Sequence, residues 1–155
     1  TQEIQRLIGR SLRAIVDLQS MGEIQIRIDC DVVQADGGTR TAAITGAYIA
    51  LFEAFVHCKR SEIITKIPII DSVAAVSCGI HNGQILLDLD YAEDSSADAD
   101  ANFILTGQNK IVEIQATAED YPFSHEIFHK LSNLAANGLK DITKIQHNAL
   151  KHFKS

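Results

Sequence analysis

The feature that most constrains this 155-residue chain is the pair Gly37–Gly38, followed directly by Thr39 and Arg40 at the start of a long apolar stretch. The N-terminus of a helix presents backbone N–H groups and the positive end of the helix dipole. Glycine lets the main chain approach an anion closely, and arginine offers a planar fork of donors suited to phosphate. Gly38, Thr39 and Arg40 are therefore candidate phosphate-binding residues. A glycine-rich connection with a solvated arginine is the alternative.

The periodicity of the chain predicts alternating helices and strands in one α+β domain spanning residues 1–155, with packed helices on a mixed β-sheet. Apolar residues alternate with polar ones before the Gly-Gly pair, which predicts a strand with one buried face. Asp36 is a plausible helix cap, Gly46 indicates close packing of its helix, and Gly138 is expected to interrupt the last helix. The predicted helices span residues 2–18, 39–59, 124–137 and 139–153, and the predicted strands 24–32, 73–80, 84–91, 102–106 and 110–117.

A concentration of carboxylates runs from Asp88 to Asp100. A solvated acidic loop is the usual meaning of such a run. The alternative is a site for a hard cation, because Mg²⁺ takes oxygen ligands and often uses only one or two carboxylates together with substrate phosphates. The residues alone leave both interpretations open.

A basic stripe lies on the first predicted helix, where Arg6, Arg10 and Arg13 share a face. These arginines are candidates for RNA binding or for a subunit contact, and a solvated face is the equally plausible alternative. The whole chain is acidic, with a net charge of −6 and a pI near 5.4. An acidic chain that binds nucleic acid must concentrate its positive charge locally.

The cysteine content and the hydropathy of the chain indicate its redox compartment and whether it spans a membrane. Cys30, Cys58 and Cys78 are widely spaced and odd in number, which favours reduced core positions in a cytoplasmic protein over a disulfide framework. No apolar run is expected to reach the roughly 20 residues that span a membrane, so no membrane partner is predicted.

Four motifs resemble ribonuclease PH in order and spacing. They read EIQRLIGRSLRAIVD, IDCDVVQADGGTRTAAITGA, LDLDYAEDSSADADAN and EIQATAEDYPFS, and the resemblance extends from Thr1 to about Gly138. That family comprises phosphorolytic 3′→5′ exoribonucleases related to polynucleotide phosphorylase and the exosome ring subunits. The resemblance implies a ribosomal protein S5 domain 2-like fold. Because the N-terminal part of the family pattern is absent, the chain is expected to be the C-terminal portion of a longer protein.

The resemblance also assigns roles to residues. It implies that Asp94 and Asp100 are active-site aspartates facing Arg40, and that inorganic phosphate is the co-substrate. Asp94 and Asp100 would hold Mg²⁺, or one of them would protonate the leaving 3′-oxygen. In the second case Asp100 is preferred as the Mg²⁺ ligand and Asp94 as the acid. It further implies trimming of tRNA 3′ ends with release of nucleoside diphosphates, a reverse reaction that adds nucleotides, and a homohexameric ring. Two alternatives stay open. The chain could be a catalytically inactive structural subunit. It could also be a shortened, inactive chain, because the family has a phosphate-binding arginine just before the position of Thr1.

Overall fold

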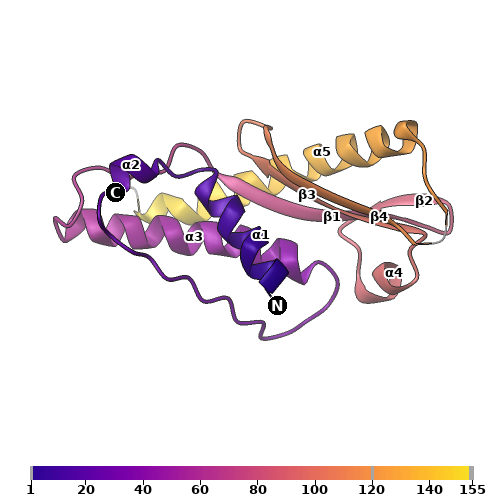
Figure 1. Ribbon diagram of the computed structural model, residues 1–155, viewed down its shortest axis with the longest axis horizontal. Coiled ribbons are helices and arrows are strands. Elements are labelled where there is room, and N and C mark those ends of the chain that lie inside the picture. Colours follow the sequence, from indigo (N-terminus) through magenta and orange to yellow (C-terminus); the bar gives the residue numbers. More distant parts are fainter. Residues whose placement is uncertain (1, 120, 154–155) are drawn as a thin grey trace.

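The computed structural model describes residues 2–119 and 121–153; residue 1, where the family resemblance begins, and residues 120, 154 and 155 lie outside the described residues. Figure 1 shows a sheet with helices on both of its faces. The elements in chain order are α1 (Gln2–Arg13), α2 (Leu18–Met21), α3 (Thr39–Arg60), β1 (Val73–His81), β2 (Gln84–Leu87), α4 (Tyr91–Ser95), β3 (Ala99–Thr106), β4 (Ile111–Ala118), α5 (His125–Ala149) and the 3-10 helix η1 (Leu150–Phe153).

The sheet has the strand order β2-β1-β3-β4. All three described ladders are antiparallel, so the expected α+β class is confirmed while the pairing is not mixed. Short connections explain the hairpins β1-β2 and β3-β4, whereas the ladder between β1 and β3 forms after the chain has passed through β2 and α4. Asn82 and Gly83 form the first hairpin with φ angles of 50° and 72°, which fits the turn type that Asn-Gly pairs favour.

The two central strands of the sheet, β1 and β3, bury both of their faces. Along β1, Val73 and Ala75 belong to a cluster shared with α1 and α3, whereas Ala74 and Val76 belong to a second cluster shared with α5. This alternation follows from the period of two in a strand. Burying a large apolar side chain contributes about 1.5–3 kcal/mol, so the two clusters fix α3 and α5 on opposite faces of the sheet. The prediction of a single domain over residues 1–155 stays a prediction.

The C-terminal helix is also joined to the other layer by a buried amide. Gln146 is 2% exposed, and its Nε2 donates to the backbone oxygens of Thr45 at 3.1 Å and Val73 at 3.0 Å. These bonds connect α5 with α3 and with the start of β1. The position of α3 along the sheet is therefore held by polar contacts as well as by packing.

The strand predicted over residues 24–32 is wrong. This stretch is extended and carries the expected alternation, because Ile24, Ile26 and Ile28 are half-buried against the first cluster while their neighbours are exposed. It forms no ladder with any strand among the described residues. A strand requires a neighbour for its backbone N–H and C=O groups, and periodicity within the segment does not supply one.

Two helix boundaries also differ from the prediction. The first helix ends at Arg13 rather than near residue 18, because Val16 forms a bridge with Ile69. The last helix continues through Gly138, where a break was expected. A Cβ at position 138 would lie 2.6 Å from Cδ2 of Leu87, so this glycine lets α5 approach β2 rather than ending the helix.

Helix α3 is long and apolar enough to cross a membrane by length and composition alone, with a mean hydropathy of 1.4 over 18 residues. We expected no run of that kind. Its buried side chains, including Ile44, Tyr48 and Phe55, pack in the cluster shared with α1 and β1. A helix at the centre of a protein core has the same composition, so this property is weak evidence for a membrane span.

Gly46 does not mark close packing, contrary to the prediction, because a Cβ there would meet nothing within 4 Å. The residue is exposed inside α3. We therefore expect Gly46→Ala to raise the free energy of unfolding by about 0.5–1 kcal/mol, since alanine restricts the unfolded chain and favours the helix. Urea unfolding would measure the gain. Ala50→Gly, at another exposed position of α3, should lose a similar amount, and a destabilised Gly46→Ala variant would contradict the account.

Candidate active site

Helix α3 begins with an open N-terminus. Its N-cap residue is Gly38, in the left-handed conformation with φ 70° and ψ 19°, and no side chain caps the helix. The first N–H groups of a helix have no partner within it. The hydroxyl of Thr39 donates to the backbone oxygen of Asp36 at 2.9 Å, and that of Thr41 donates to Gly38 at 2.7 Å. These contacts hold the turn while Arg40 stays exposed.

Asp36 does not cap α3, which corrects the prediction. Its carboxylate instead accepts the N–H of Gly37 at 2.8 Å and the N–H of Tyr91 at 2.7 Å. Local spacing indicates a cap, but the side chain reaches a segment 55 residues away. The turn and the acidic segment are thereby joined, and Figure 1 shows α4 beside the starting end of α3.

The acidic segment leaves the sheet earlier than predicted. Strand β2 ends at Leu87, because Asp88 adopts a φ of 59° and turns the chain. The short helix α4 follows, with a capping box in which the Asp90 side chain accepts the N–H of Glu93 and the Glu93 side chain accepts the N–H of Asp90. Asp94 lies in this helix, and its side chain is carried by a helix rather than by an unstructured loop.

Asp100 comes from the sheet. It lies in β3 opposite Gly79 of β1 and Thr117 of β4. In a strand, residues two apart share a face, so Asp100 lies on the face of Ile104, which packs in the cluster with α3. Asp100 therefore faces the helix that carries Arg40.

The charges of Arg40 and Asp94 both act on the carboxyl group of Asp100. Burial, followed by the negative charge of Asp94, raises the pKa of the Asp100 carboxyl group, while the positive charge of Arg40 lowers it. Such effects require charges near one another. The structure thus places Arg40, from the start of a helix, and Asp94, from a short helix, near Asp100 of a strand.

The same residues fit a divalent cation, although among residues 2–119 and 121–153 no group of three or more His, Cys, Asp or Glu side chains could hold a metal ion. Two carboxylates are the complement that Mg²⁺ uses when phosphate oxygens supply further ligands. The repulsion that raises the pKa of Asp100 is also what a bound cation would relieve. Asp94 and Asp100 are the residues that would hold it.

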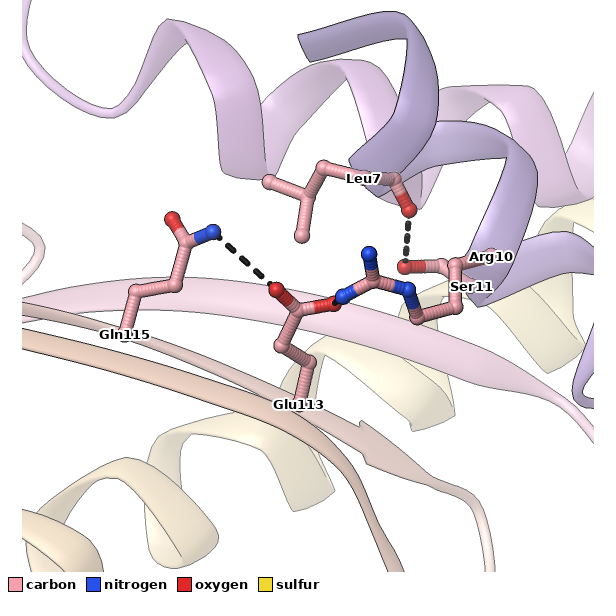
Figure 2. A network of polar contacts seen from close by, with 5 residues as sticks. All are labelled: Leu7, Arg10, Ser11, Glu113 and Gln115. Carbon is pink, nitrogen blue, oxygen red and sulfur yellow. Dashed lines mark hydrogen bonds and ion pairs between the residues drawn. The ribbon is translucent and has the colours of Figure 1, made fainter. Parts of the chain in front are cut away.

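The three arginines of α1 do not share one environment. Arg10 forms an ion pair with Glu113 of β4, and Glu113 also accepts a hydrogen bond from Gln115 at 3.0 Å. Figure 2 shows the Arg10 side chain directed at Glu113, with Ser11 bonded to the backbone of Leu7. Arg6 and Arg13 instead line a small pocket on α1. The RNA-binding role of these arginines stays a prediction, and Arg10 already has a partner.

The ion pair of Arg10 should contribute little to stability. The arginine side chain is 56% exposed, although that of Glu113 is only 14% exposed, and ion pairs that solvent reaches are typically worth about 0–1 kcal/mol. We expect Arg10→Ala to lower the free energy of unfolding by less than about 1 kcal/mol. A double-mutant cycle with Glu113→Gln in urea would isolate the coupling, and a coupling of several kcal/mol would contradict this expectation.

One cavity lies outside the space between the aspartates and the anion turn, which is the name used here for residues 37–40. It has a volume of about 980 Å³ and lies between α1, α3 and the extended segment 26–32. Thr39 and Arg40 line one part of it, but neither Asp94 nor Asp100 does. The remaining lining is mainly apolar, including Ile8, Leu12 and Phe55. This cavity therefore belongs to the layer of α1 and α3, and it does not contain the predicted catalytic carboxylates.

Two residues that support the site, Asp36 and Ser77, and one that shares the strand face of Asp100 were missed from the sequence. Asp36 joins the turn to α4 as described. Ser77 holds the beginning of the acidic segment, because its oxygens accept the N–H groups of Asp88 at 2.7 Å and Leu89 at 3.2 Å. Asn102 is 9% exposed and lies on the same face as Asp100. Of these residues, only Asn102 could have been found from the sequence, because residues two apart in a strand share a face and Asn102 follows Asp100 by two.

The two halves of the chain match the two domains of one family. The family described as "3′ exoribonuclease family, domain 1" matches residues 1–57, and its domain 2 matches residues 71–138. The chain therefore belongs to the 3′ exoribonuclease family.

Within that family, several curated relatives that the chain matches bear the name ribonuclease PH. The protein from Methylobacterium nodulans is 60% identical over 150 residues, which cover 97% of this chain and 63% of the relative. The one from Rhodospirillum rubrum is 58% identical over 154 residues, which cover 99% of this chain and 64% of the relative. The chain thus spans slightly less than two thirds of the length of these proteins.

Solved structures show the same fold at low identity. Rice Rrp46 has a TM-score of 0.65 at 18% identity, covering 99% of this chain and 66% of its own. An Archaeoglobus fulgidus exosome with RNA bound to the active site has a TM-score of 0.68 at 20% identity, covering 93% of this chain and 60% of its own. These likenesses confirm the expected ribonuclease PH-like fold.

Proposed function

We propose that the chain is the part of a phosphate-dependent 3′→5′ exoribonuclease that holds the attacking phosphate and the active-site carboxylates. In that reaction, inorganic phosphate attacks the terminal phosphodiester of RNA and releases a nucleoside diphosphate. The observation that carries the proposal is the meeting of Arg40 at the start of α3 with Asp94 and Asp100. Family membership and relatives named ribonuclease PH support it.

The chemical problem is to bring two anions together. Gly38, Thr39 and Arg40 would bind and orient the inorganic phosphate at the start of the helix, where the dipole and the open N–H groups favour an anion. Its oxygen forms a bond to the terminal phosphorus as the bond to the 3′-oxygen breaks. Arg40 would offset the negative charge that is shared between the two phosphates in the transition state.

The carboxylates would serve the other side of the scissile bond. Mg²⁺, when bound by Asp94 and Asp100, supplies positive charge next to the scissile phosphate. The leaving 3′-oxygen takes up a proton. The alternative to a cation held by both carboxylates is a cation held by Asp100 alone, with Asp94 as the proton donor. Asp94 is exposed whereas Asp100 is half-buried, which favours Asp94 for the second of these roles.

The finer features of the proposal concern substrate and assembly. We propose that the RNA is the 3′ end of a tRNA precursor, that the reaction runs in reverse from nucleoside diphosphates by microscopic reversibility, and that the working form is a homohexameric ring in the cytoplasm. A ring would group arginines from neighbouring chains and so let an acidic chain hold RNA. The relatives named ribonuclease PH and the structural neighbour described as an exosome support the proposal of an RNA substrate and of a ring assembly.

The experiment that tests the function is incubation of the chain with a tRNA carrying extra 3′ nucleotides, with and without inorganic phosphate. We expect nucleoside diphosphates to appear only when phosphate and Mg²⁺ are present. Nucleoside monophosphates released without phosphate would indicate hydrolysis and contradict the proposal. Binding of the tRNA without release of any nucleotide would instead support the alternative of a catalytically inactive structural subunit.

A further inference from the structure

The carboxylate of Asp36 connects two segments that are distant in sequence. One oxygen, Oδ1, accepts both the N–H of Gly37 at 2.8 Å and the N–H of Tyr91 at 2.7 Å. The first bond belongs to the anion turn and the second to the start of α4. These two donors hold the pKa of the Asp36 carboxyl group below its usual value, so the group is ionised at neutral pH.

The backbone makes the same connection by close approach. A Cβ at Gly37 would lie 2.0 Å from the carbonyl oxygen of Leu89 and 2.7 Å from the carbonyl carbon of Asp90. No residue other than glycine fits at position 37 without a shift of one of the two segments. The turn therefore rests directly on the residues that lead into α4.

Helix α4 transmits this position to Asp94. The helix has only five residues, so Tyr91 and Asp94 lie within little more than one turn. Asp94 donates its N–H to the backbone oxygen of Asp90 at 2.9 Å, which is the residue that Gly37 contacts. A shift of Tyr91 relative to the turn would therefore move Asp94 relative to Arg40.

We infer that Asp36 is a positioning residue, which holds α4 and its Asp94 against the anion turn by binding the Gly37 and Tyr91 amides on one oxygen. The part of this inference that concerns catalysis rests on the proposed function. Asp36 touches neither the phosphate nor the RNA in that scheme. Its effect is exerted through the distance between Arg40 and Asp94.

Three variants separate the contributions of the hydrogen-bond acceptor, of the close backbone contact and of the charge of Asp36. Asp36→Ala removes the acceptor, Gly37→Ala separates the two segments by steric contact, and Asp36→Asn retains an oxygen at the Oδ1 position without the charge. Glu23→Ala removes an exposed carboxylate just before the extended segment 24–32 and serves as the matched control. The kinetic measurement is phosphorolysis of a short RNA, with kcat and the KM for inorganic phosphate determined separately.

The amide of Tyr91 gives a reading that does not depend on activity. Tyr91 is the first residue of α4, so its N–H has no partner within the helix, and its protection from hydrogen exchange depends on Asp36. We expect Asp36→Ala to accelerate exchange at Tyr91 and to lower kcat about 10–100-fold, as expected for misplacement on the scale of 1 Å. The KM for phosphate should change less, because Arg40 and the start of α3 are retained. Asp36→Asn should restore most of both properties, and Gly37→Ala should resemble Asp36→Ala.

Two results would overturn the inference. One is an unchanged exchange rate at Tyr91 in Asp36→Ala, which would mean that the carboxylate does not hold the two segments together. The other is accelerated exchange with unchanged kcat, which would mean that the link does not position Asp94. If the wild-type chain itself releases no diphosphate, the proposed function fails, and the exchange measurement alone then decides whether Asp36 joins the turn to α4.

Discussion

Replacing Arg40 with alanine is expected to lower phosphate-dependent release of nucleoside diphosphates by about 10²–10³-fold, the usual cost of removing one group that stabilises transition-state charge. The side chain is exposed at the start of α3, so the fold should be retained. Arg40→Lys keeps the positive charge but loses the planar fork, and its rate should lie between those of the wild type and Arg40→Ala. Initial rates at several phosphate concentrations would measure the effect.

A second measurement on the Arg40→Ala variant does not depend on catalytic activity. Because the charge of Arg40 lowers the pKa of the Asp100 carboxyl group, Arg40→Ala should raise that pKa further, as followed by ¹³C NMR titration of the carboxyl carbon. Arg27→Ala, which removes an exposed arginine from the extended segment, should leave both the rate and the pKa unchanged. Unaltered phosphorolysis in Arg40→Ala would remove the anion-site assignment.

Replacing Asp100 with asparagine should abolish the response of the reaction to Mg²⁺. The variant keeps the shape of the side chain but removes one of the two negative charges that would hold the cation. Rates measured over a range of Mg²⁺ concentrations would report the loss, and wild-type metal dependence in this variant would reassign Asp100. Asp98→Asn, at an exposed acidic position of the same segment, is the matched control and should keep the Mg²⁺ response.

The same substitution should stabilise the metal-free protein at neutral pH. The pKa of Asp100 is raised in the folded state above 3.8 by burial and by Asp94, so the folded state binds the proton more tightly than the unfolded state. Stability therefore falls as pH rises through the interval between the two pKa values, and the full penalty is present above the folded-state pKa. The neutral amide of the Asp100→Asn variant carries no such penalty. The higher Tm of this variant should shrink toward the wild-type value as the pH falls to about 3.8, and a lower Tm at neutral pH would contradict this account.

The parts of the fold and site that were predictable depend on neighbours in sequence. The Gly37–Gly38 turn and the hairpin at Asn82–Gly83 were found because glycine and asparagine mark backbone conformations that few other residues adopt. The start of α3 followed from the change of period after Gly38. These features are confirmed in the structure.

The parts that were not predictable depend on contacts across the chain. Local spacing makes Asp36 a helix cap, whereas its carboxylate binds the amide of Tyr91. The left-handed conformation of Asp88 ends β2 early, and aspartate adopts it without a distinctive sequence signal. Gly46 and Gly138 look alike within helical sequence, yet only Gly138 has a close neighbour. The meeting of Arg40, Asp94 and Asp100 was implied by family resemblance and not by any property of the three residues alone.

The extended segment 24–32 has a consequence for how the chain behaves in solution. Its alternating isoleucines and backbone amides pair with no strand among the described residues, and an unsatisfied edge of this kind is a template on which another polypeptide can add. Concentrated samples should therefore self-associate through this stretch, and a proline at the exposed position of Gln25 should favour the dispersed form.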